Sequence, residues 1–181
     1  PGLNVSSVHI ANAVAAAEAM QHLYDLGHQR IGVITGPLLS PISRDRLSGV
    51  QGAAAGQRLW DEVLVRTGDF SVDSGEALTH DLLAEDNPPT AIFCFSDEMA
   101  IGAIAALRER GLDCPRDVSV VGFDDIRYAR AFQPALTTIS QPKEAIGRKA
   151  VEMLLAILSR KAEGLASITL PHELVVRAST A

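Results

Sequence analysis

Short apolar runs alternate with longer helical patterns along most of this chain, and this alternation constrains its fold more than any other feature. Strand-like runs separated by helical segments are typical of βαβ units, which build a mainly parallel sheet covered by helices. The predicted strands are Val8–Ile10, Ile31–Thr35, Val63–Val65, Ala91–Phe95 and Val118–Phe123. The predicted helices between them are Asn12–Leu26, Arg44–Ala55, Val72–Ala84 and Asp97–Arg110. We therefore expect an α/β fold.

The residues at the ends of the predicted helices support these assignments. Side chains that can accept hydrogen bonds from first-turn amides precede or begin each helix, and glycines that tolerate a left-handed backbone follow two of them. The expected N-caps are Asn12, Ser43, Ser71 and Ser96, and the expected C-terminal glycines are Gly27 and Gly111.

The alternating pattern changes after Phe123. A loop-like stretch precedes a short β-prone run at Leu136–Ser140, and a long helix is predicted from near Pro142 to about Ser159 because apolar residues recur on one stripe and proline suits a first helical turn. A final extended segment is predicted at Ile168–Val176.

Composition excludes several classes of protein. The 181 residues carry a formal net charge of -6, with no basic run that could bind a phosphate backbone. Cys94 and Cys114 lack metal-type or redox-type spacing, which favours a reducing cytoplasm. We expect no signal peptide and no membrane partner, since no apolar run reaches spanning length. Pro1 is not a natural start, so the sequence upstream of it is not seen.

Polar and aromatic side chains gather just after the predicted strands. In an open α/β sheet, ligands bind beyond the carboxyl ends of the strands, and these positions hold Arg46, Phe70, Ser96 and Asp124. Carboxylates and arginine can hydrogen-bond vicinal hydroxyls while an aromatic ring covers an apolar face, so this set predicts a sugar or nucleoside ligand. Structural roles remain open: Ser96 could be only an N-cap, and Asp97 only a favourable charge at a helix N-terminus.

Enzyme motifs are weak or absent. The sequence has no glycine-rich dinucleotide turn, phosphate loop, serine elbow or zinc-protease helix, and its five histidines are scattered. Cys94 lies in the most apolar predicted strand and reads as a buried small hydrophobe. We expect no catalytic residues, no metal and no cofactor.

One helical stretch, Met99–Leu107, has no polar residue and must be covered on more than one side. The sheet accounts for one side, and a second copy of the chain in a twofold dimer is an economical cover for the other. A neighbouring helix of the same chain is the alternative.

Several runs resemble the LacI/GalR family of bacterial transcriptional repressors, in the part that follows the DNA-binding headpiece. These runs are residues 27–37, Arg46-Leu47-Ser48-Gly49, the segments 89–94 and 97–102, residues 118–125, residues 134–142, and Arg177 with Ser179-Thr180. The resemblance implies a periplasmic-binding-protein-like type I architecture, flavodoxin-like, with helices on both faces of a parallel sheet. It also implies a C-terminal subdomain at about 11–135 and 164–181, with parts of the N-terminal subdomain at about 1–10 and 136–163.

The resemblance assigns effector contacts to Arg46, Phe70, Ser96, Asp124 and Gln141. Ser40 and Ile42 depart from it, because some members carry other polar or charged residues there.

The expected function is that of a cytoplasmic effector-binding and dimerisation domain of a repressor, which contacts operator DNA only through a headpiece absent from these residues. A periplasmic sugar-binding protein is the alternative, because it shares the fold. Asp124 and Arg46 are the expected polar anchors, and replacing either should weaken binding with little effect on folding.

Overall fold

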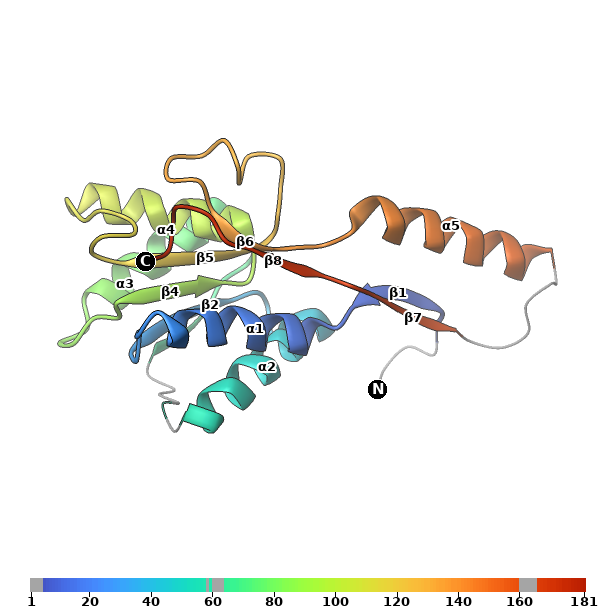
Figure 1. The fold of residues 1–181 in the computed structure, drawn as a ribbon, viewed down its shortest axis with the longest axis horizontal. Coiled ribbons are helices and arrows are strands. Elements are labelled where there is room, and N and C mark those ends of the chain that lie inside the picture. The colour runs from blue at the N-terminus through green and yellow to red at the C-terminus, as the bar shows by residue number, and fades with distance from the viewer. Residues whose placement is uncertain (1–4, 58, 60–63, 160–165) are drawn as a thin grey trace.

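The computed structural model describes residues 5–57, 59, 64–159 and 166–181. A six-stranded sheet of order β3-β2-β4-β5-β6-β8 forms the main body (Figure 1). Its strands are β2 (Ile31–Thr35), β3 (Val65–Thr67), β4 (Ala91–Cys94), β5 (Ser119–Asp124), β6 (Thr137–Ser140) and β8 (Glu173–Val175). Neighbouring strands run parallel except β8, which is antiparallel to β6. The mainly parallel α/β fold is confirmed.

Four helices cover the two faces of this sheet. Helices α1 and α2 lie together on one face, and α3 and α4 lie together on the other (Figure 1). Their bounds are α1 (Asn12–Asp25), α2 (Pro41–Gln57), α3 (Val72–Leu83) and α4 (Asp97–Glu109). The buried core between them includes the rings of Phe93 and Phe123 and aliphatic residues of β2, β4 and β5.

A smaller part extends from the main body. It consists of the parallel pair β1 (Ser7–Ile10) and β7 (Ser167–Leu170), with helix α5 (Lys143–Leu158) beside it (Figure 1). The chain passes between the two parts at 10–12, 140–143 and 170–173. Among the described residues, no helix is long and apolar enough to cross a membrane.

This arrangement moves the edges of the predicted subdomains. Strand β6 lies in the large sheet although 136–163 was assigned to the smaller part, and β7 pairs with β1 although 164–181 was assigned to the larger part. The predicted extended segment Ile168–Val176 is therefore two strands in two sheets. The division into subdomains itself stays a prediction.

Several element ends differ from those predicted. Helix α2 begins at Pro41 rather than Arg44, since proline fits the first helical turn, so Ser43 lies inside the helix and caps nothing. Asn12 is the first residue of α1, after Ala11. Strand β3 begins at Val65; Val63, where that strand was predicted to begin, lies outside the described residues.

Other predicted helix ends are confirmed. The Ser71 and Ser96 hydroxyls accept hydrogen bonds from the Ser74 and Met99 amides, which caps α3 and α4. Gly27 and Gly111 follow α1 and α4 with φ of 93° and 72°.

The cover of α4 comes from the same chain. A side chain at Gly102 would meet the Val72 carbonyl oxygen at 2.0 Å, and one at Gly75 would meet the Met99 carbonyl oxygen at 2.2 Å, so α3 and α4 pack backbone to backbone. Ile104 is only 1% exposed. The argument that α4 needs a second copy of the chain as its cover is therefore wrong: the sheet and α3 cover it.

Candidate functional site

A polar pocket opens at the carboxyl ends of the parallel strands. Its volume is about 430 Å³. It lies where β2 leads to a helix on one face of the sheet and β4 leads to a helix on the other, which is the point where open α/β sheets bind ligands. Its lining includes all five predicted site residues and three more: Ser40, Ile42, Arg46, Phe70, Ser96, Glu98, Asp124 and Gln141.

Arg46 is held firmly from α2 beneath this pocket. The residue is 4% exposed, and its Cζ lies 3.5 Å from the centroid of the Phe123 ring. Its Nε donates to Asn12 Oδ1 at 3.0 Å, and Nη1 donates to the Phe95 carbonyl oxygen. Burial lowers the pKa of Arg46 to about 10, against the opposing effect of Asp124. The guanidinium remains a cation at neutral pH.

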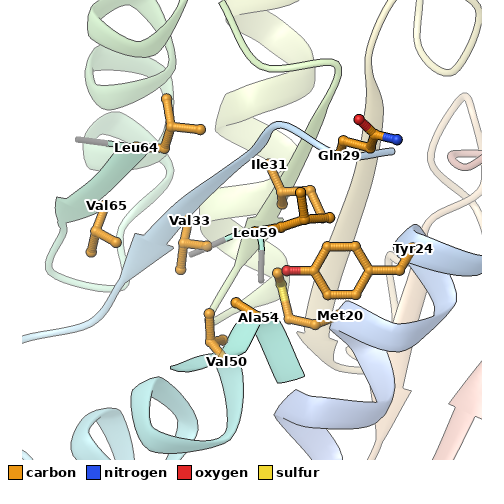
Figure 2. Close-up of a pocket in the computed structure, with 10 residues that line it drawn as sticks. All are labelled: Met20, Tyr24, Gln29, Ile31, Val33, Val50, Ala54, Leu59, Leu64 and Val65. Carbon is orange, nitrogen blue, oxygen red and sulfur yellow. The ribbon is translucent and has the colours of Figure 1, made fainter. Parts of the chain in front are cut away.

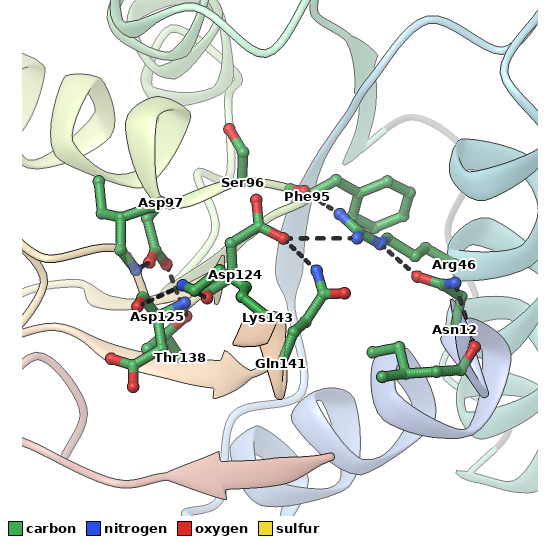
Figure 3. A network of polar contacts seen from close by, with 12 residues as sticks. Asn12, Arg46, Phe95, Ser96, Asp97, Asp124, Asp125, Thr138, Gln141 and Lys143 are labelled. Carbon is green, nitrogen blue, oxygen red and sulfur yellow. Dashed lines mark hydrogen bonds and ion pairs between the residues drawn. The ribbon is translucent and has the colours of Figure 1, made fainter. Parts of the chain in front are cut away.

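Asp124 ends β5 in a strained backbone conformation, with φ of 113°. Its Oδ1 lies 3.6 Å from Arg46 Nη2 and accepts a hydrogen bond from Gln141 Nε2 (Figure 3). Lys143 Nζ, at the start of α5, donates to the Asp124 and Asp125 carbonyl oxygens at 2.6 and 2.8 Å. Burial raises the pKa of Asp124, and Arg46 opposes this shift. Strain that surrounding contacts maintain in this way is common at binding sites.

Phe70 also has a left-handed backbone, with φ of 73°. Its ring lies against Gly36, where a Cβ atom would meet the ring at 2.0 Å. The turn is fixed by Asp69, whose carboxylate accepts from the Ser71 amide at 2.8 Å; its contacts with Ser71 and Ser74 lower the pKa of Asp69 to about 2. Phe70 therefore presents an aromatic wall to the pocket.

Asp97 has a structural position beside the pocket. It is fully buried, and its carboxylate accepts from Thr138 Oγ1 at 2.5 Å and from the Ile126 amide at 2.7 Å. These contacts join α4 to β6 and to the loop after β5 (Figure 3). Burial raises the pKa of Asp97 to about 7, although both hydrogen bonds oppose the shift. The structural interpretation of Asp97 is confirmed.

The sequence reasoning missed three residues of this site. Glu98 lines the pocket, Asn12 holds Arg46, and Lys143 fixes the strained backbone of Asp124. Glu98 lies three residues after the end of the predicted strand Ala91–Phe95, so its position was a usable signal. The other two reach the site across 34 and 19 residues of sequence, a distance that no local pattern spans.

A second, much smaller hollow lies between α1, α2 and strands β2 and β3 (Figure 2). Its volume is about 10 Å³, which is at the lower limit for one water molecule, and side chains such as Met20, Val33 and Val50 line it. It is a packing defect of the core and cannot hold a metabolite.

One group of described residues has metal-ligand spacing: the ligand atoms of Glu76, His80 and Glu109 lie within 4.8 Å of one another. Arg110 Nε donates to His80 Nδ1 at 3.2 Å, and His80 Nε2 lies 3.2 Å from Glu109 Oε2. An arginine already supplies positive charge to this group, so we interpret it as a surface hydrogen-bond network between α3 and α4.

Comparison with known proteins identifies the family. The model of the periplasmic binding protein-like domain matches residues 20–180. The HTH-type transcriptional repressor CytR of Escherichia coli (strain K12) is 40% identical over 181 residues, covering 99% of this chain and 53% of the repressor. The chain thus spans about half the length of the curated relatives it matches.

Solved structures agree with this match. A transcriptional regulator CelR-cellobiose complex superposes with a TM-score of 0.94 at 36% identity, covering 99% of this chain and 55% of that one. A dimeric Lac repressor superposes with a TM-score of 0.91 at 34% identity, covering 98% and 65%. The relatives named here are transcriptional regulators rather than enzymes. The resemblance to LacI/GalR regulators is confirmed, and the chain belongs to the periplasmic binding protein-like domain family.

Proposed function

We propose that this chain is the effector-sensing part of a DNA-binding transcriptional repressor and that it binds a sugar or nucleoside in the pocket at the strand ends. The observation that carries the proposal is that Arg46, Phe70, Ser96, Asp124 and Gln141 line one pocket of about 430 Å³. That volume suits a small metabolite. The match to a cellobiose complex of a related regulator supports a sugar-like ligand.

The chemistry of the pocket supports hydroxyl recognition. The Asp124 side chain remains 29% exposed, so its carboxylate can accept hydrogen bonds from ligand hydroxyls while Arg46 holds it in place. Phe70 offers an aromatic face for the apolar side of a sugar ring or base. No residue of this set is arranged as a nucleophile with a base, so we propose binding without catalysis.

Partners and location follow from the same relatives. We propose that the full-length protein is a cytoplasmic homodimer, supported by the match to a dimeric Lac repressor. Operator DNA would be contacted outside these residues, because their formal net charge is -6. The matches to repressors do not favour the periplasmic-transport alternative. Sedimentation of the full-length protein at micromolar concentration tests the dimer, and a monomer would contradict it.

Calorimetric titration of the full-length regulator with pentoses, hexoses, disaccharides and nucleosides tests the binding proposal. For a ligand that binds, Asp124→Asn should weaken affinity by about ten- to a hundred-fold, because ligand hydroxyls lose a charged acceptor. Phe70→Ala should weaken it by removing the aromatic wall.

Asp125→Asn is the matched control, because Asp125 is the next residue but its carboxylate pairs with Arg177 Nη2 at 2.7 Å, away from the pocket. Equal losses in Asp124→Asn and Asp125→Asn would contradict the site, and no binding to any member of the panel would contradict the function.

A further inference from the structure

The pocket contains more negative charge than its arginine can balance. Glu98, the second residue of α4, lines the pocket together with Asp124. Burial is the main cause that raises the pKa of Asp124, and the charge of Glu98, which lines the same pocket, raises it further. Among the described residues that line the pocket, Arg46 is the one cationic side chain, set against these two carboxylates.

The cations near the pocket already have partners within the chain. Arg46 donates hydrogen bonds from Nε to Asn12 and from Nη1 to the Phe95 carbonyl oxygen. Its Nη2 forms an ion pair with Asp124. Its face is covered by a phenyl ring at 3.5 Å. Lys143 Nζ donates to two backbone carbonyls. A phosphate group entering the pocket would therefore compete with these contacts for each cation.

The N-terminus of α4 does not supply a phosphate site either. Helix N-termini attract anions because their first amides are unpaired and the helix dipole is positive there. In α4 the Ser96 hydroxyl accepts from the Met99 amide, and Asp97 and Glu98 place two carboxyl groups in the first turn. The positive end of the α4 dipole is therefore already next to two acidic side chains, Asp97 and Glu98, and does not attract a further anion.

We infer that the pocket selects uncharged polyhydroxylated effectors over their phosphorylated forms and that Glu98 sets this preference. The inference rests on the proposed function and makes its ligand class narrower. Repulsion between Glu98 and a phosphate opposes binding of the charged ligand, whereas hydroxyls donate to Glu98 and Asp124 at no electrostatic cost. Glucose and nucleosides then fit the site, and sugar phosphates and nucleotides do not.

Calorimetry of the full-length regulator with matched pairs tests the inference: ribose with ribose 5-phosphate, glucose with glucose 6-phosphate, and uridine with uridine 5′-monophosphate. We expect the uncharged member of a binding pair to be preferred by about ten-fold or more, since one repulsion at short range in a partly buried site is worth about 1.4 kcal/mol. Glu98→Gln should reduce the ratio of the two affinities several-fold, even though the uncharged member also loses a charged acceptor and binds more weakly.

Glu109→Gln is the matched control, because Glu109 ends the same helix but its carboxylate contacts His80 outside the pocket. A phosphorylated member that binds as tightly as its uncharged partner overturns the inference while supporting the proposed function. A preference for uncharged ligands that Glu98→Gln leaves intact overturns the role of Glu98. If no pair binds at all, the proposed function fails and the inference fails with it.

Discussion

Helices α4 and α5 are both rich in apolar residues, yet they differ completely in burial. In α4 eight residues are buried, including Met99, Ile104 and Leu107, because the sheet covers one side and α3 covers another. In α5 none is buried, and Leu158 is 70% exposed. The difference teaches that an apolar helix indicates a need for cover but does not say which element provides it.

The close packing of α4 depends on two glycines, whereas α5 projects from the body beside β1 and β7 (Figure 1). The following predictions test the two helices against each other.

The largest effect is expected from a charge placed on each helix. Ile104→Asp should unfold the chain or destabilise it by about 4 kcal/mol or more, because it buries a carboxylate without a partner. If a second copy of the chain covered α4, as the sequence favoured, the same charge would only separate the two copies. Leu158→Asp on α5 should change stability by less than about 0.5 kcal/mol in the same urea titration. Similar losses of unfolding free energy in the two variants would contradict the difference in burial between α4 and α5.

A smaller effect is expected from single methyl groups. Gly102→Ala should cost about 1 to 3 kcal/mol of unfolding free energy, because its Cβ would overlap the Val72 carbonyl and force α3 away. Gly147→Ala on α5 meets nothing within 4 Å and should instead stabilise the chain by about 0.5 to 1 kcal/mol. Thermal unfolding of both variants gives the comparison, and a stabilised Gly102→Ala variant would show that the helices do not pack this closely.

Arg46 and Asp124 differ in a similar way, since Arg46 is 4% exposed and Asp124 is partly open to the pocket. Arg46→Ala should lower stability by about 2 to 4 kcal/mol, because it removes the donor to Asn12 Oδ1 and to the Phe95 carbonyl and the cation paired with Asp124. The sequence alone predicted little effect on folding for this replacement, and the burial of Arg46 now predicts a larger one. Arg46→Ala is therefore a stability test, measured by urea unfolding, and a loss below about 1 kcal/mol would contradict it.

The smallest effect concerns the first residue of α4. Asp97 has a pKa of about 7 in the folded chain, above its ordinary 3.8, so the folded state holds this proton where the unfolded state has lost it. The stabilising contribution of the neutral carboxyl is complete below about pH 4 and is lost as the pH rises to about 7.

Urea unfolding at pH 5 and pH 8 should therefore show a loss in the wild type that is smaller in Asp97→Asn. Burial lowers the pKa values of His22 and His28 in both proteins, so their contributions cancel in this difference. Identical pH dependence in the two proteins would contradict a raised Asp97 pKa.

Much of the fold could be predicted because its elements have strong local signals. Strand β2 matches its predicted range, since five buried residues form one apolar run between turn residues. Strand β3 was misplaced because this edge strand has no fully buried residue to mark it. The start of α2 was missed because the preference of proline for a first turn was not applied at Pro41.

The candidate site could be predicted in part for a related reason. Strand-end positions identify Ser96 and Asp124 from topology alone, because parallel strands deliver their carboxyl ends to one edge. The partners of Arg46 come from α1, from the residue that follows β4 and from β5, and such contacts depend on packing that no sequence spacing contains.

The chain passes between the body and the smaller part three times, at 10–12, 140–143 and 170–173. One connecting segment would leave the smaller part free to rotate about it, whereas three connecting segments restrict that rotation. Two of them are fastened at their ends: Lys143 holds the second to the end of β5, and His172 Nε2 contacts Glu18 Oε2 of α1 at 3.0 Å beside the third. Lys143 is the first residue of α5, so its hydrogen bond joins the start of that helix to the strand end that carries Asp124, and the second crossing is thereby part of the pocket's own contacts.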